Sequence, residues 1–233
     1  VNIIGTQNLL EAALKNGVNK FIHTSTSEVY GSAQFTPMTE KHPCVAQSPY
    51  SASKIAADAL VTSYNKSFNL NTLILRPFNT FGPRQSGRAI IPTIIQQAIK
   101  GRKINLGNLK PKRDFTYVED TVAAFELALK SNLYFKGETL NLGTGYSYSV
   151  LQIIKYISKI LDKKLEIVSE KERLRPLKSE VDNLISSNLK ARKILKWKPK
   201  LVGPEGLEKG ILKTINFFKT HNKNTNTSNK FIY

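Results

Sequence analysis

The chain has 233 residues, of which 40% are hydrophobic and 22% charged, an ordinary globular composition that allows one large domain or two small ones. Its single cysteine, Cys44, excludes an internal disulfide and fits a reducing, cytoplasmic location. No apolar run approaches the ~18 residues of a membrane-spanning helix. The three histidines are isolated and the sequence has no Cys/His cluster, so we expect no metal site.

The net charge of +18 comes from 35 Lys and Arg against 17 Asp and Glu. Such an excess raises the question of a nucleic-acid or membrane partner. The basic residues are spread along the chain, however, and the sequence contains no recognised nucleic-acid motif. We therefore expect no nucleic acid and no membrane as partner, and favour a small anionic substrate.

Apolar residues follow the helical period in some segments and form short continuous runs in others. The segment from His221 to the C-terminus at Tyr233 is rich in Asn, Thr, Ser and Lys, which predicts a disordered tail. In chain order we expect a helix at Val1–Asn16, a strand at Lys20–His23, a loop at Gly31–Pro49, a helix at Ser51–Phe68, a strand at Leu73–Leu75, a helix at Ile90–Lys100, a strand at Lys103–Leu106, a helix at Thr121–Leu129, a strand at Thr139–Leu142, a helix at Ser149–Leu161, a strand at Leu165–Val168, and helices at Asn188–Leu195 and Pro204–Lys219.

Tyr50 and Lys54 are the first candidates for chemistry. They are four residues apart, so a helix places both side chains on one face, one turn apart. An ammonium beside a phenol favours the phenolate and lowers its pKa. Such a tyrosine can take the proton of a sugar hydroxyl while hydride leaves the same carbon. When a tyrosine and a lysine with this spacing stand alone, they are usually a packed ring and a solvated charge. Further residues must therefore support a catalytic role for Tyr50 and Lys54.

That support comes from a polar cluster at the end of the first predicted strand. Thr24-Ser25-Thr26-Ser27-Glu28 lies roughly twenty residues before Tyr50, and active sites of open α/β sheets lie at the carboxyl ends of strands. A third stretch, Arg76-Pro77-Phe78-Asn79-Thr80-Phe81-Gly82-Pro83-Arg84, follows the next predicted strand. Together these motifs resemble the extended short-chain dehydrogenase/reductase family, the NAD-dependent nucleotide-sugar epimerases and dehydratases.

The resemblance implies an α/β fold, a Rossmann-like doubly wound parallel sheet with a smaller α/β substrate-binding lobe. We expect the cofactor domain over 1–150 with lobe insertions around 83–112, the substrate lobe and closing helix over 151–220, and the tail over 221–233. The family's glycine-rich turn for the pyrophosphate is absent, which indicates the C-terminal part of a longer enzyme that could be inactive alone. Family members dimerise through helices matching 2–16 and 51–68.

The resemblance also assigns roles to single residues. Tyr50 is the expected base, Lys54 its support and a ligand of the nicotinamide ribose, and Thr26 a hydroxyl near the reacting oxygen. Further NAD contacts are expected from Thr24, Ser25, Pro77 and Phe78. Substrate contacts are expected from Asn79, Arg88, Arg113 and Arg175. The guanidinium groups of the three arginines suit paired phosphate oxygens.

Glu28 separates the possible reactions. Once sugar C4 is a ketone, a carboxylate at this place can remove the C5 proton, and the C6 hydroxyl can then leave; a 4-epimerase does not need it. Ser27 stands where thymidine-diphosphoglucose dehydratases carry an aspartic acid, so the acid for the leaving group stays open. Gln47–Asp58 and Arg76–Thr93 resemble the LegB-type dehydratases of nucleotide-linked N-acetylglucosamine. We therefore expect a 4,6-dehydratase of UDP- or GDP-N-acetylglucosamine, with UDP-glucuronate decarboxylase or UDP-sugar 4-epimerase as the alternatives.

Overall fold

The computed structural model describes residues 1–169 and 183–221. Arg175 and the tail expected beyond His221 lie outside these ranges. The helices are α1 (Asn2–Lys15), the 3-10 helix η1 (Ser27–Tyr30), α2 (Pro49–Phe68), α3 (Ile90–Lys100), α4 (Val118–Lys130), α5 (Val150–Leu161), α6 (Leu189–Leu195) and α7 (Gly203–His221). The strands are β1 (Phe21–Thr24), β2 (Thr72–Pro77), β3 (Asn79–Phe81), β4 (Lys103–Leu106), β5 (Lys112–Tyr117), β6 (Glu138–Leu142), β7 (Ser147–Ser149) and β8 (Glu166–Ser169).

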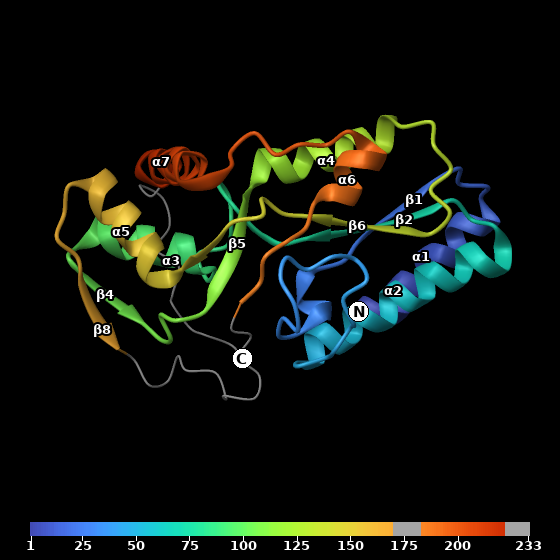
Figure 1. The fold of residues 1–233 in the computed structure, drawn as a ribbon, viewed down its shortest axis with the longest axis horizontal. Coiled ribbons are helices and arrows are strands. Elements are labelled where there is room, and N and C mark those ends of the chain that lie inside the picture. Colours follow the sequence, from blue (N-terminus) through green and yellow to red (C-terminus); the bar gives the residue numbers. More distant parts are fainter. Residues whose placement is uncertain (170–182, 222–233) are drawn as a thin grey trace.

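A parallel sheet of order β1-β2-β6 lies between two layers of helices, with α4 and α6 on one face and α1 and α2 on the other (Figure 1). Successive side chains of a strand point to opposite faces. Leu73 and Leu75 of β2 accordingly pack in the cluster that contains Trp197, whereas Ile74 packs in the cluster that contains Leu10 and Val61. The sheet is covered on both faces, and the expected Rossmann-like α/β fold is confirmed.

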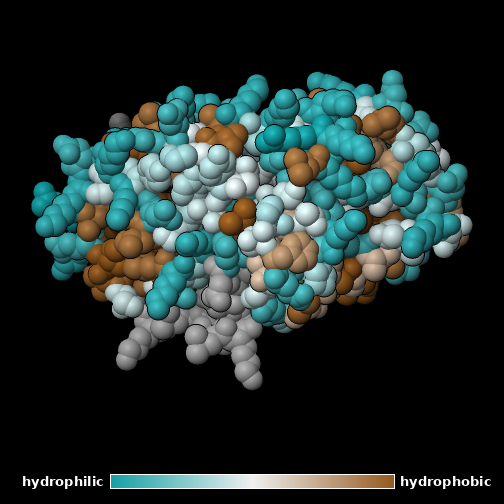
Figure 2. All heavy atoms as spheres, viewed as in Figure 1, coloured by the Kyte–Doolittle hydropathy of each residue, from teal (hydrophilic) through white to brown (hydrophobic). Residues whose placement is uncertain are grey.

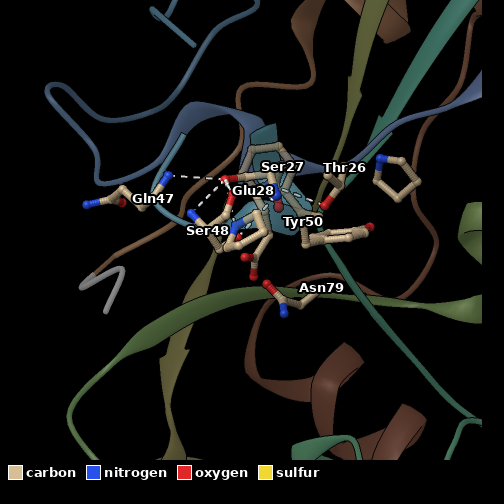
Figure 3. Close-up of a pocket in the computed structure, with 11 residues that line it drawn as sticks. Thr26, Ser27, Glu28, Gln47, Ser48, Tyr50 and Asn79 are labelled. Carbon is tan, nitrogen blue, oxygen red and sulfur yellow. Dashed lines mark hydrogen bonds between the residues drawn. The ribbon is translucent and has the colours of Figure 1, made fainter. Parts of the chain in front are cut away.

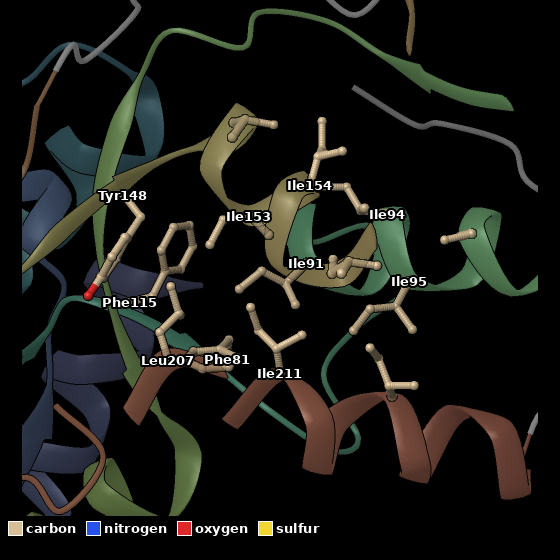
Figure 4. Close-up of a cluster of buried hydrophobic side chains, with 14 of the residues drawn as sticks. Phe81, Ile91, Ile94, Ile95, Phe115, Tyr148, Ile153, Ile154, Leu207 and Ile211 are labelled. Carbon is tan, nitrogen blue, oxygen red and sulfur yellow. The ribbon is translucent and has the colours of Figure 1, made fainter. Parts of the chain in front are cut away.

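A second group of elements lies beside this sheet (Figure 1). Strand β5 pairs with β3 in parallel and with β7 in antiparallel fashion, and β4 pairs with β8 in parallel. Helices α3, α5 and α7 enclose the largest apolar cluster, which is rich in isoleucine and includes Ile91, Ile95, Ile153 and Ile211 (Figure 4). Helix α3 and strand β4, from the expected 83–112 insertion, therefore pack with α5 and α7; the division into domains remains a prediction.

Three strands, β3, β5 and β7, were not expected from the sequence, and α4 begins at Val118 rather than at Thr121. Strand β5 was missed because its pattern contains a charged residue, Asp114, that the fold buries completely. The Asp114 carboxylate accepts hydrogen bonds from the backbone N–H groups of Thr144, Gly145 and Ser186 and from the Thr144 hydroxyl, at 2.6–3.1 Å. A buried charge is tolerated when it is hydrogen-bonded in this way.

The visible surface is mainly hydrophilic, with separate apolar patches, in the view of Figure 2. None of the described helices has the length and apolar character needed to cross a membrane. The same residues contain no group of three or more His, Cys, Asp or Glu side chains that could hold a metal ion.

Candidate active site

A cleft of about 630 Å³ opens at the carboxyl ends of β1 and β2. Its walls come from η1, from the start of α2 and from the segment that joins β2 to β3, so stretches far apart in the sequence meet here (Figure 3). The lining residues are Thr26, Ser27, Glu28, Gln47, Ser48, Pro49, Tyr50, Ser51, Pro77, Phe78 and Asn79.

Local structure fixes the first wall. The Thr26 side chain caps η1 by accepting a hydrogen bond from the backbone N–H of Glu28 at 3.2 Å. Gly31 ends η1 with a φ of +63°, a conformation that favours glycine. A side chain at Gly31 would also place its Cβ 2.6 Å from the Val45 carbonyl oxygen. The short helix therefore starts and stops at defined residues, and Glu28 is held between them.

A capping box fixes the start of α2. The Ser48 hydroxyl accepts a hydrogen bond from the Ser51 backbone N–H at 3.1 Å, and the Ser51 hydroxyl accepts one from the Ser48 backbone N–H at 3.1 Å. Pro49 occupies the first turn, where its missing N–H is not needed. Tyr50 consequently stands in the first turn of α2 at the cleft. The expected helix begins two residues later, at Ser51, and the box was not predicted because Ser51 stands where such a box usually carries Glu or Gln.

Tyr50 is 49% exposed and shares the cleft with Thr26 and Glu28 (Figure 3). Partial burial and the Glu28 carboxylate raise the pKa of Tyr50, while hydrogen bonding with the Thr26 side chain opposes the rise. The expectation that Lys54 lowers this pKa is therefore wrong for the protein by itself. Desolvation penalises the phenolate, and the negative charge of Glu28 adds to that penalty.

Lys54 lies one turn further along α2 and reaches back to β1. Its Nζ donates a hydrogen bond to the Thr24 carbonyl oxygen at 2.7 Å. Burial lowers the pKa of Lys54, and the nearby Asp58 carboxylate opposes this. The Ser25 side chain is buried and donates to Asp58 Oδ2 at 2.8 Å, and its contact with NAD stays a prediction. Asp58 was not predicted as a site residue, although it follows Lys54 by four residues on the same helix.

The opposite wall carries Pro77, Phe78 and Asn79. Phe78 is 3% exposed and packs in a buried apolar cluster behind this wall. Asn79 contributes a polar atom, its Oδ1, which is buried and has no hydrogen-bond partner among the described residues. A buried acceptor without a partner is unfavourable in the free protein. It suits a site where a ligand supplies the missing donor.

Of the predicted arginines, Arg88 and Arg113 lie in the described part of the chain, and neither lines this cleft. Arg88 is exposed in the segment before α3. Arg113 is half-buried on β5, and its Nη1 donates to the Lys112 carbonyl oxygen at 3.1 Å. The structure therefore brings together Thr26, Ser27, Glu28, Tyr50 and Asn79 in one cleft, but not the two described arginines.

Comparison with known proteins shows the family of the chain. The sequence profile of the family described as "GDP-mannose 4,6 dehydratase" matches residues 1–210. The chain belongs to this family. Among curated proteins it is similar to the low-salt glycan biosynthesis protein Agl12 of Haloferax volcanii, with 35% identity over 211 residues, 89% of this chain and 65% of that protein. It is also 35% identical to the dTDP-D-glucose 4,6-dehydratase of Mus musculus over 215 residues, 91% of this chain and 60% of that enzyme.

Solved structures place this family member among epimerases as well. The UDP-glucuronic acid 4-epimerase of Bacillus cereus, solved with UDP-glucuronic acid and NAD, superposes with a TM-score of 0.85 at 30% identity, covering 94% of this chain and 67% of that one. The dTDP-glucose 4,6-dehydratase of Bacillus anthracis, solved with NAD, gives a TM-score of 0.83 at 28% identity, covering 94% and 68%. The chain spans 60–65% of the length of the first curated relatives it matches.

Proposed function

We propose that this chain carries the reaction centre of an NAD-dependent nucleotide-sugar 4,6-dehydratase. The observation that carries the proposal is the meeting of Tyr50, Thr26 and Glu28 in one cleft at the carboxyl ends of two parallel strands. A phenol and a carboxylate that share a cleft supply two separate proton-accepting groups. An oxidation at one sugar carbon followed by proton removal at the next carbon needs two such groups.

The residues of the cleft fit the nicotinamide half of NAD. The Lys54 ammonium has three N–H donors and directs one to the Thr24 carbonyl, which leaves donors for ribose hydroxyls. Pro77 and Phe78 supply an apolar wall against which a flat ring can lie. When bound, NAD supplies an acceptor for the hydride of C4 and returns that hydride to C6.

Tyr50 acts on the C4 hydroxyl in this proposal. Its oxygen takes the hydroxyl proton as the C4–H bond breaks, so it must first be a phenolate. The raised pKa of Tyr50 disfavours that form in the free protein. Hydrogen bonding with the Thr26 side chain opposes this rise and favours the phenolate.

Glu28 acts on the neighbouring carbon. The C4 ketone makes the C5–H bond acidic, and the Glu28 carboxylate takes that proton. The electron pair forms the C5–C6 double bond, and the C6 hydroxyl leaves as water with a proton donated by Ser27 or by protonated Glu28. Ser27 is 2% exposed and adjoins Glu28 in η1, so its hydroxyl belongs to the same wall of the cleft.

For the substrate we propose N-acetylglucosamine linked to UDP or GDP, on the resemblance of Gln47–Asp58 and Arg76–Thr93 to LegB-type dehydratases. Arg88, Arg113 and Arg175 remain proposed ligands of the diphosphate. We also propose a homodimer through α1 and α2, supported by the exposed apolar side chains of Ile4, Leu9 and Phe68 on these helices.

The epimerases among the relatives favour a second candidate, 4-epimerisation. Incubating the complete gene product with NAD and, in turn, UDP-N-acetylglucosamine, GDP-N-acetylglucosamine, UDP-glucuronate and UDP-glucose separates the candidates. A 4-keto-6-deoxy product from an N-acetylglucosamine nucleotide supports the proposal. Release of carbon dioxide from UDP-glucuronate, or a C4 epimer without loss of water, contradicts it.

A further inference from the structure

A buried polar cluster lies directly behind the cleft, centred on Asp58 of α2. Asp58 is 5% exposed, and its Oδ2 accepts hydrogen bonds from Ser25 Oγ at 2.8 Å and from Nε and Nη2 of Arg76 at 3.0 and 2.9 Å. Its Oδ1 lies 3.4 Å from Nε2 of His23. These contacts tie α2 to the carboxyl ends of β1 and β2, the two strands that border the cleft.

The polar contacts of Asp58 restrict the sliding and turning of α2 on the sheet, which apolar packing leaves open. Asp58 follows Lys54 by one helical turn and Tyr50 by two, so the three side chains lie along one side of α2. The buried Ala57 and Val61 hold α2 against the sheet, but hydrophobic contact is non-directional. The hydrogen bonds from Nε and Nη2 of Arg76, which converge on Asp58 Oδ2, are charge-assisted and directional. Directional contacts of this kind restrict how α2 can slide and turn on the sheet.

We propose that Asp58 is a positioning residue for the reaction of the cleft, holding α2 where Lys54 meets the Thr24 carbonyl and Tyr50 meets Thr26. The inference rests on the proposed function. Stability alone is a weak reason for such a cluster, because replacing a buried ion pair by neutral groups that pack well is often harmless to stability. Reaction rates respond more steeply, since a misplacement of about 1 Å can lower them by about 10²-fold.

Asp58 also acts on Lys54 through its charge. Burial lowers the pKa of Lys54, and the Asp58 carboxylate opposes this lowering. Arg76 in turn lies over the Tyr30 ring, with its Cζ 4.8 Å from the ring centroid. The titratable groups that face the Asp58–Arg76 pair are His23 from β1, Lys54 from α2 itself, Tyr30 from η1 and Cys44 from the loop that follows η1.

The test compares Asp58→Asn with Asp120→Asn in the complete gene product. Asp120 is a matched control because it is 4% exposed and its carboxylate accepts hydrogen bonds from the backbone N–H groups of Lys200 and Leu201, outside the cleft. One readout needs no turnover: NMR titration of methylated lysines, with the Lys54 signal assigned from Lys54→Arg. The other is kcat and KM for the nucleotide sugar.

We expect Asp58→Asn to move the Lys54 titration to lower pH and to lower kcat roughly 10–100-fold, with a smaller change in KM. Asp58→Glu keeps the charge and should restore the Lys54 titration. Asp120→Asn should lower Tm but leave both readouts unchanged. A wild-type Lys54 titration in Asp58→Asn overturns the inference. The turnover of Tyr50→Phe tests the proposed function separately.

A second variant covers the case in which Asp58→Asn does not fold. Asp58→Asn combined with Arg76→Gln leaves no unpaired buried charge, so we expect a Tm near that of the wild type. The inference predicts that kcat remains low in this double variant, because the directional contact is gone. Recovery of kcat together with Tm would show that Asp58 serves stability only.

Discussion

Tyr50 decides the chemistry at the scale of single residues. Replacing it with Phe removes one hydroxyl from a side chain that is half exposed, so the fold and the nucleotide-sugar affinity should stay close to those of the wild type. The loss of a principal acid–base group typically lowers the rate 10²–10⁴-fold. We expect that loss in steady-state turnover of Tyr50→Phe. Turnover at the wild-type rate would remove Tyr50 from the mechanism.

Two neighbours of Tyr50 should shift its titration in opposite directions. As a base, Tyr50 must be deprotonated, so the single-turnover rate of C4 oxidation should rise with pH through its pKa. Glu28 raises that pKa and hydrogen bonding with Thr26 lowers it. Glu28→Gln should therefore move the rising limb to lower pH, and Thr26→Val should move it to higher pH. If the rising limbs of the pH–rate profiles coincide in the two variants, a group other than Tyr50 controls the oxidation.

The sequence was informative about which residues meet and less so about their electrostatics. The four-residue spacing correctly predicted that Tyr50 and Lys54 share one side of a helix beside the end of β1. It did not predict that the pKa of Tyr50 is raised, because burial and the distance to Glu28 depend on packing. Nor could it show that Ser25 donates to Asp58, since that bond joins two elements 33 positions apart.

At the scale of elements, the start of α2 is the sensitive point, and α5 offers a matched control. Ser48 and Ser149 each cap a helix with the same reciprocal pair of hydrogen bonds. Replacing either by Ala should lower the free energy of unfolding by about 1 kcal/mol. Only Ser48→Ala disturbs the turn that carries Tyr50, so only this variant should lose kcat, by roughly tenfold.

Urea denaturation and turnover of the two variants check this prediction. Equal losses of kcat in Ser48→Ala and Ser149→Ala would mean that the capping box of α2 has no special link to the cleft. The start of α5 was predicted at Ser149, because a polar residue there precedes a strongly amphipathic segment. Ser48 was missed because its box has Ser51 where the box of α5 has the usual Gln, at position 152.

At the scale of the whole molecule, regular elements were predictable and irregular ones were not. The strand at Lys103–Leu106 and the helix at Ile90–Lys100 match the expected bounds, since each is a clear apolar pattern. Strands β3 and β7 are three residues long and carry too little pattern to be recognised. Strand β5 contains the fully buried carboxylate of Asp114, whose hydrogen-bond partners Thr144 and Ser186 lie far away in the sequence. Long-range polar contacts of this kind become visible only in the folded chain.

In the proposed reaction, the cleft removes a proton from C5 of a nucleotide sugar and expels the C6 hydroxyl. Mass spectrometry of the product formed in deuterated water, with NAD and UDP- or GDP-N-acetylglucosamine, tests it most directly. We expect the loss of one water and the gain of one solvent deuteron at C5, and we expect Glu28→Gln to abolish both. A product of unchanged mass that carries no deuterium, an epimer at C4, would contradict it.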